Sequence, residues 1–141
     1  MNTAAIDQPA EPGANTLRNF AELTGRVLLA ALFLLSGLGK IPGYAATAGY
    51  MASVGVPGGL LPVVIALEVL GAAALIIGWK TRIMAFLLAG FTLLSAVLFH
   101  SNFADQVQMI MFLKNLSIAG GLLLLVVHGA GRISVDRRNA N

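Results

Sequence analysis

The chain has 141 residues, of which 57% are hydrophobic and 11% are charged, and its formal net charge is +3. Soluble domains carry about 25% charged residues, so this composition argues against an ordinary soluble protein and indicates a membrane protein. The sequence contains no cysteine, which excludes disulfides, thiolate metal sites and thiol redox chemistry. The basic residues are scattered without interleaved aromatic residues, and no nucleic-acid partner is expected.

Residues 1–20 are polar and include Pro9, Pro12 and Gly13. This composition predicts a flexible N-terminal tail. A cleaved signal peptide is not expected, because no basic segment directly precedes the first apolar run.

Four apolar segments follow the tail, at residues 23–39, 60–78, 83–99 and 107–127. Each is near the roughly 20 residues that a helix needs to cross a hydrocarbon core, and none alternates with a period of two. We therefore predict an all-α fold, an integral membrane four-helix bundle within residues 21–130. Residues 131–141 are predicted to form a basic C-terminal tail.

The connections between the segments differ in length. Residues 79–82 form a short turn, which makes the second and third segments an antiparallel hairpin and places Trp79 at the membrane interface. The first outer connection spans residues 41–59, where clusters of proline and glycine end the first helix and introduce the second. The second outer connection, residues 100–106, is brief.

Lysine and arginine indicate the orientation. Seven of the nine basic residues fall in three places that four crossings bring to one side: Arg18, Arg26, Lys80, Arg82, Arg132, Arg137 and Arg138. The positive-inside rule therefore places both termini in the cytoplasm, with Arg26, Lys80 and Arg82 at the cytoplasmic interface. Lys40 and Lys114 fall near the opposite face.

Glu68 lies near the middle of the second apolar segment. A charge at that depth costs from about 2.5 to more than 10 kcal/mol, so such residues usually face a partner or a water-filled cavity. Helical spacing predicts that Glu68 meets Lys40, His100 and Lys114 in the outer half of the bundle. Polar or small neighbours on the same helix faces are Ser36, Gly37, Gly71, Asn115 and Ser117.

Two interpretations of this cluster stay open. It could be a structural ion-pair network that holds the helices together. It could instead be a site for a polar headgroup, since two lysines for one glutamate leave positive charge for a quinone carbonyl, an anionic lipid or a small acid. Glu68 would then be either a paired carboxylate or a protonated acid in a proton relay.

Catalytic and metal sites are not predicted. His100 and His128 end their helices on opposite sides of the membrane, so they cannot share a haem iron. The sequence offers no metal-ligand cluster and no nucleophile motif, and a stand-alone enzyme is not expected.

The sequence resembles the DoxX family of small bacterial inner-membrane proteins over residues 23–128. The resemblance rests on RVLLAALFLLSGLGK from Arg26 to Lys40, on Glu68 with Gly71, on GWKTR ending at Arg82, on His100, and on Lys114-Asn115-Leu116 with Gly120-Gly121. It implies a four-helix fold in the inner membrane and redox roles, because relatives include a subunit linked to quinone-coupled thiosulfate oxidation and one with oxidative-stress partners. Related membrane proteins that exchange disulfides use cysteine pairs, which this chain lacks.

Two functions follow from these observations. In the first, the chain is a small subunit or accessory partner of a quinone-linked or oxidative-stress oxidoreductase, with quinone as the candidate cofactor. In the second, it is a transport module, or one that binds lipid or a small anion through the same charged cluster. The expected partners are the lipid bilayer, redox subunits and a second copy of the chain.

Overall fold

The computed structural model describes residues 12–140 and contains, in chain order, α1 (Pro12–Lys40), α2 (Tyr44–Ser53), the 3₁₀ helix η1 (Gly58–Leu60), α3 (Leu61–Ile77), α4 (Thr81–Phe99), α5 (Gln106–His128) and α6 (Val135–Arg138). No strand occurs within the described residues. Four helices are long and apolar enough to cross a membrane: α1, α3 with η1, α4 and α5. The prediction of an all-α membrane protein with four spans is confirmed.

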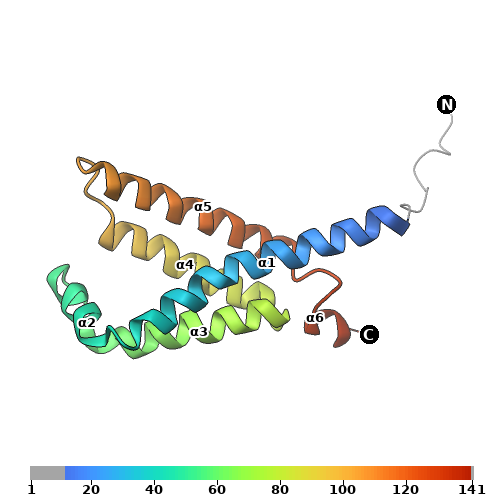
Figure 1. The fold of residues 1–141 in the computed structure, drawn as a ribbon, viewed down its shortest axis with the longest axis horizontal. Helices are drawn as coiled ribbons and strands as arrows, with labels where there is room; N and C mark the ends of the chain where they lie inside the picture. Colours follow the sequence, from blue (N-terminus) through green and yellow to red (C-terminus); the bar gives the residue numbers. More distant parts are fainter. Residues whose placement is uncertain (1–11, 141) are drawn as a thin grey trace.

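The spanning helices are arranged as two pairs. α1 packs on α3 and α4 packs on α5, while a smaller contact between α3 and α4 joins the pairs. Figure 1 shows the pairs crossing near the α3–α4 turn and diverging towards α2 and the α4–α5 connection. We call the end at the α3–α4 turn the closed end of the bundle. The opposite end, at α2 and the α4–α5 connection, is the open end. The buried core lies where the pairs cross, and it consists of Ala30, Phe33, Ala72, Leu75, Ala85, Leu88, Ala89 and Leu122.

Helix α1 begins earlier than the sequence indicated. It starts at Pro12, whereas a flexible tail was predicted up to residue 20; residues 1–11 of that tail lie outside the described part of the chain. Proline is favourable in the first turn of a helix, where its missing N–H would have no intrahelical partner. At 29 residues, α1 is longer than a hydrocarbon core requires, and its first turns project beyond the other helices (Figure 1).

The first outer connection is not an irregular loop throughout. Residues Tyr44–Ser53 form α2. This helix was not predicted, because proline and glycine clusters flank it on both sides and indicate a loop. Met51 of α2 is buried, and the ring of Tyr50 lies 5.4 Å from that of Phe99 on α4. Helix α2 therefore bridges the two helix pairs at the open end.

The predicted C-terminal tail is in fact folded against the closed end. Residues 129–138, which we call the C-terminal segment, turn back after α5 and finish in α6. The carboxylate of Asp136 accepts hydrogen bonds from the backbone N–H groups of Lys80, at 2.6 Å, and Thr81, at 2.9 Å. It thereby caps the start of α4, where backbone N–H groups have no partners within the helix.

The close contact between α1 and α3 depends on Gly37. A Cβ atom at Gly37 would lie 2.8 Å from Cγ2 of Val69 and 3.0 Å from Cβ of Glu68, whereas one at Gly39 would have nothing within 4 Å. We expect Gly37→Ala to destabilise the protein by about 1 to 3 kcal/mol, because α1 and α3 must separate. Gly39→Ala should be neutral or stabilising, since alanine favours the helix. Thermal unfolding in mild detergent measures both, and equal melting temperatures would contradict the contact.

Candidate functional site

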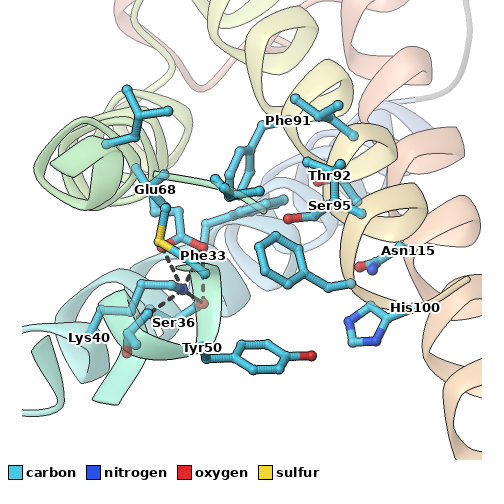
Figure 2. Close-up of a pocket in the computed structure, with 18 of the residues that line it drawn as sticks. Phe33, Ser36, Lys40, Tyr50, Glu68, Phe91, Thr92, Ser95, His100 and Asn115 are labelled. Carbon is cyan, nitrogen blue, oxygen red and sulfur yellow. Dashed lines mark hydrogen bonds and ion pairs between the residues drawn. The ribbon is translucent and has the colours of Figure 1, made fainter. Parts of the chain in front are cut away.

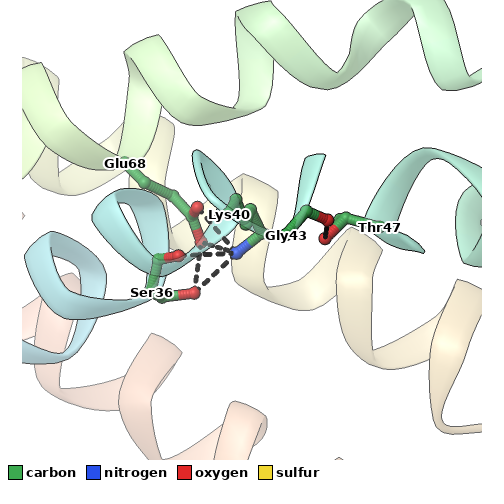
Figure 3. Close-up of polar contacts among 5 residues, drawn as sticks. All are labelled: Ser36, Lys40, Gly43, Thr47 and Glu68. Carbon is green, nitrogen blue, oxygen red and sulfur yellow. Dashed lines mark hydrogen bonds and ion pairs between the residues drawn. The ribbon is translucent and has the colours of Figure 1, made fainter. Parts of the chain in front are cut away.

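The centre of the candidate site is an ion pair between α1 and α3. Nζ of Lys40 lies 2.8 Å from Oε2 of Glu68, and it donates a hydrogen bond to Oε1 at 3.0 Å. The hydroxyl of Ser36 donates to the same Oε1 atom at 3.0 Å and accepts from Lys40 at 2.6 Å. Figure 3 shows the three side chains in contact. Of the two lysines expected near Glu68, Lys40 is the one that pairs with it in the structure.

The helices position these groups by simple spacing. Ser36 and Lys40 are one turn apart on α1, and both face α3. Gly37 lies between them and lets the backbones approach. The side chain of Glu68 is only 4% exposed and that of Lys40 is 22% exposed. Because the carboxylate is buried, its interaction with Lys40 is screened far less than a surface pair would be.

The ion pair borders a cavity of about 420 Å³ at the open end of the bundle. Aromatic side chains supply much of its wall: Phe33 from α1, Tyr50 from α2, and Phe91 and Phe99 from α4. Figure 2 shows the Lys40–Glu68 pair on one side of this space and the α4 and α5 side chains on the other. The cavity thus lies between the two helix pairs.

Polar groups face the cavity from the side opposite the ion pair. His100 lines the cavity and its Nδ1 atom lies 2.8 Å from Oε1 of Gln108. Ser95 and Asn115 also line it, and their side chains make no hydrogen bond in the part of the chain that the structure describes. These two side chains can therefore form hydrogen bonds with a ligand without losing a hydrogen bond within the protein.

The structure brings together some of the predicted site residues and separates others. Ser36, Lys40, Glu68, His100 and Asn115 line the same cavity. The other lysine, Lys114, does not: it is exposed and absent from the lining. Neighbouring residues on a helix point about 100° apart, so only one of Lys114 and Asn115 can face the bundle.

The remaining predicted neighbours have structural positions. Ser117 is exposed, and its hydroxyl donates to the carbonyl oxygen of Leu113 at 3.0 Å. Gly71 packs against Leu88, which would lie 3.2 Å from a Cβ added there. Neither residue lines the cavity.

Among the residues expected at the interface, Arg26 differs most from the prediction. It is 1% exposed, and its guanidinium donates to the carbonyl oxygens of Ala130, of Ile133 at 2.8 Å and of Ile76 at 3.2 Å. Arg26 thus holds the C-terminal segment from inside the bundle. Lys80 and Arg82 are exposed at the closed end, as an interfacial position requires.

Sequence reasoning missed the aromatic wall of the cavity. Phenylalanine occurs in three of the four spanning helices, at lipid-facing positions such as Phe86, which is 62% exposed, as well as in the wall. The residue type alone therefore does not indicate which rings face the cavity. Tyr50 was missed because α2 was not predicted. No three His, Cys, Asp or Glu side chains among residues 12–140 are placed to hold a metal ion.

Comparison with known proteins gives two clear relatives. A family model described as DoxX matches residues 21–101. The chain is 52% identical over 121 residues to "Inner membrane protein YqjF" of Escherichia coli (strain K12), covering 86% of this chain and 93% of the relative. It is 40% identical over 139 aligned positions to "Inner membrane protein YphA" of the same strain, covering 88% of this chain and 99% of the relative. No solved structure matches significantly.

Proposed function

Because this chain belongs to the DoxX family and is a multi-pass inner-membrane protein, we propose that its cavity beside Glu68 binds a quinone. In this proposal the chain is a small accessory subunit of a quinone-linked or oxidative-stress oxidoreductase. The observation that carries the proposal is a charge-balanced Lys40–Glu68 pair at the edge of an aromatic cavity within the membrane.

The size and walls of the cavity suit a substituted ring. Binding cavities for small molecules range from about 300 to 1,000 Å³ and combine apolar walls with a few polar groups, as this one of about 420 Å³ does. The rings of Phe33, Phe91 and Phe99 offer faces and edges for stacking. Leu32 and Leu94 line the cavity and are 48% and 58% exposed, so it borders lipid, where an isoprenoid chain would extend.

The charge of the site favours a neutral ligand. Lys114 is outside the cavity, so Glu68 balances the lysine charge at the site. An anion would then have to compete with Glu68 for Lys40, whereas a quinone carbonyl needs only a hydrogen-bond donor. The hydroxyl of Ser95 and the amide of Asn115, which make no hydrogen bond among residues 12–140, supply such donors on the wall opposite the ion pair.

The orientation belongs to the same proposal. The closed end carries Lys80, Arg82 and the arginines of the C-terminal segment, and we assign it to the cytoplasmic side. The cavity then lies in the outer half of the membrane. Labelling of a cysteine introduced at Arg138 with a membrane-impermeant reagent tests this assignment in intact and permeabilised cells.

Filling the cavity should weaken quinone binding. Ser95 lines the cavity, whereas Ser117 is exposed on α5 outside it, so Ser95→Leu and Ser117→Leu make the same chemical change at a test and a control position. We expect Ser95→Leu to weaken binding of a short-chain ubiquinone at least about tenfold, because the added isobutyl group occupies the site. Ser117→Leu should bind as the parent does. Calorimetric titration of the detergent-purified protein measures both.

The same preparation tests the accessory role. Native mass spectrometry should show bound quinone and an associated redox protein after purification in mild detergent. A protein that carries no quinone, binds none when it is added, and accompanies no redox protein would overturn the proposal. Saturable binding of a small carboxylic acid in its place would identify an anion-binding or transport module.

A further inference from the structure

A second cavity lies at the closed end of the bundle, away from Glu68. It has a volume of about 710 Å³ and is lined by residues from the first half of α1, the α3–α4 turn, the end of α5 and the C-terminal segment. Its lining includes five cationic side chains, those of Arg18, Lys80, Arg82, Arg132 and Arg137. The proposed quinone site does not use any of them.

The cations outnumber the carboxylates that line this cavity, and both carboxylates have other roles. Glu22 pairs with Arg18 at 3.3 Å, and Asp136 caps α4. Burial raises the pKa of Asp136, but hydrogen bonds from Thr81 and Lys80 and the charge of Arg26 lower it further, so the net direction is below its ordinary value. Asp136 therefore stays ionised as a cap at neutral pH.

Three guanidinium groups remain without a partner. Within the described residues, the side chains of Arg82, Arg132 and Arg137 make no hydrogen bond and no ion pair, although all three line one cavity. Guanidinium groups bind phosphate oxygens through paired, charge-assisted hydrogen bonds. A phosphate group would therefore supply the acceptors that these three guanidinium groups lack.

The position of the cavity relates it to the membrane surface. Trp79, a residue type of the interfacial belt, lies beside it, with Nζ of Lys80 5.1 Å from the centre of the indole ring. Ile83 lines the cavity and is 56% exposed on a membrane-spanning helix, so the cavity joins a lipid-facing surface. A phospholipid could place its headgroup among the arginines and its acyl chains along α4.

The charge of the cavity points to the kind of headgroup. Its lining carries five cationic side chains and two carboxylates, so it favours a ligand with net negative charge. A choline headgroup adds a cation of its own beside the phosphate. A glycerol headgroup adds none, so its phosphate charge is available to the arginines.

We propose that the closed-end cavity binds an anionic phospholipid headgroup, with Arg82, Arg132 and Arg137 holding the phosphate. Basic pockets between membrane helices bind anionic headgroups in this way. The site is assembled only when the C-terminal segment is docked, because two of the three arginines belong to that segment. Lipid binding and docking of the segment therefore stabilise each other.

The test uses the full-length protein and two double variants. Arg82→Gln with Arg132→Gln removes two charges from the cavity, whereas Lys114→Gln with Arg138→Gln removes two exposed charges outside it. Binding of phosphatidylglycerol and of phosphatidylcholine is measured by native mass spectrometry, with inorganic phosphate as a competitor. The circular dichroism spectrum and melting temperature without added lipid verify that each variant is folded.

The parent and the outer variant should bind phosphatidylglycerol in preference to phosphatidylcholine. The cavity variant should bind phosphatidylglycerol about 25-fold more weakly, from about fivefold for each arginine at the surface. Equal weakening in both double variants would show a general charge effect and overturn the site. Equal affinity for both lipids would do the same, and complete displacement by millimolar phosphate would assign the cavity to the free anion instead.

Discussion

Glu68→Gln is expected to destabilise the protein by about 3 to 5 kcal/mol, the usual cost of removing one partner from a buried ion pair. The variant leaves the Lys40 ammonium beside a neutral amide within the membrane-spanning part of the bundle, where the surrounding protein and lipid solvate a charge poorly. Lys40→Met should have a similar effect, because it leaves the carboxylate of Glu68 without its cation. Urea unfolding in mild detergent, followed by circular dichroism, measures both changes.

The double variant distinguishes a coupled pair from two independent residues. Glu68→Gln combined with Lys40→Met removes both charges and should recover part of the loss, so that the effects are far from additive. Arg18→Gln is a matched control, because it breaks an exposed pair with Glu22 whose side chains are 63% and 36% exposed. Its cost should stay below about 1 kcal/mol. If the losses of unfolding free energy at residues 40 and 68 are additive, the two side chains are not coupled as an ion pair.

The outcome also separates the two interpretations of the pair. A purely structural pair can be replaced by apolar side chains without loss of function. If the pair also binds quinone, the double variant should be folded and yet fail to bind it, while Ser117→Leu binds normally. The stability measurement and the binding measurement therefore answer different questions about the same residues.

The helices, and a lysine partner for Glu68, could be predicted because each depends on local spacing. Runs of apolar residues fix the four spans, since the hydrocarbon core sets a required length. Glu68 had to find a partner, and Lys40 with Ser36 occupies one face of α1 at a matching depth. These inferences need only helix periodicity and the cost of a buried charge.

Other features could not be predicted because they depend on the rotation of one helix against another. Lys114 and Asn115 are adjacent, and a small rotation of α5 decides which of them faces the cavity. Polar and arginine-rich termini are typical of tails, yet Asp136 caps α4 across 55 residues of sequence from Thr81. Such a cap is a tertiary contact, and no local pattern near Asp136 indicates it.

Arg26 makes the buried hydrogen bonds that hold the C-terminal segment at the closed end, so its replacement should release that segment. Arg26→Leu removes donors from the carbonyl oxygens of Ile76, Ala130 and Ile133, which are then left without these partners. Each bond to a charged donor contributes about 1.5 to 3 kcal/mol, so the loss of three such bonds should cost about 3 kcal/mol or more even if their contributions add only in part. Arg26→Lys should restore little of this loss, because an ammonium lacks the planar fork that reaches several carbonyls.

Hydrogen exchange locates the effect. Amides of residues 129–138 should exchange faster in Arg26→Leu. Trypsin should also cleave faster after Arg132 and Arg137, because cleavage requires the backbone of the segment to unfold locally. Arg138→Leu provides the control, since Arg138 is exposed outside the closed-end cavity and should change neither measurement. If Arg26→Leu keeps the segment protected, Asp136 alone holds it. If the segment is released, phosphatidylglycerol binding should fall with it, because Arg132 and Arg137 leave the cavity together.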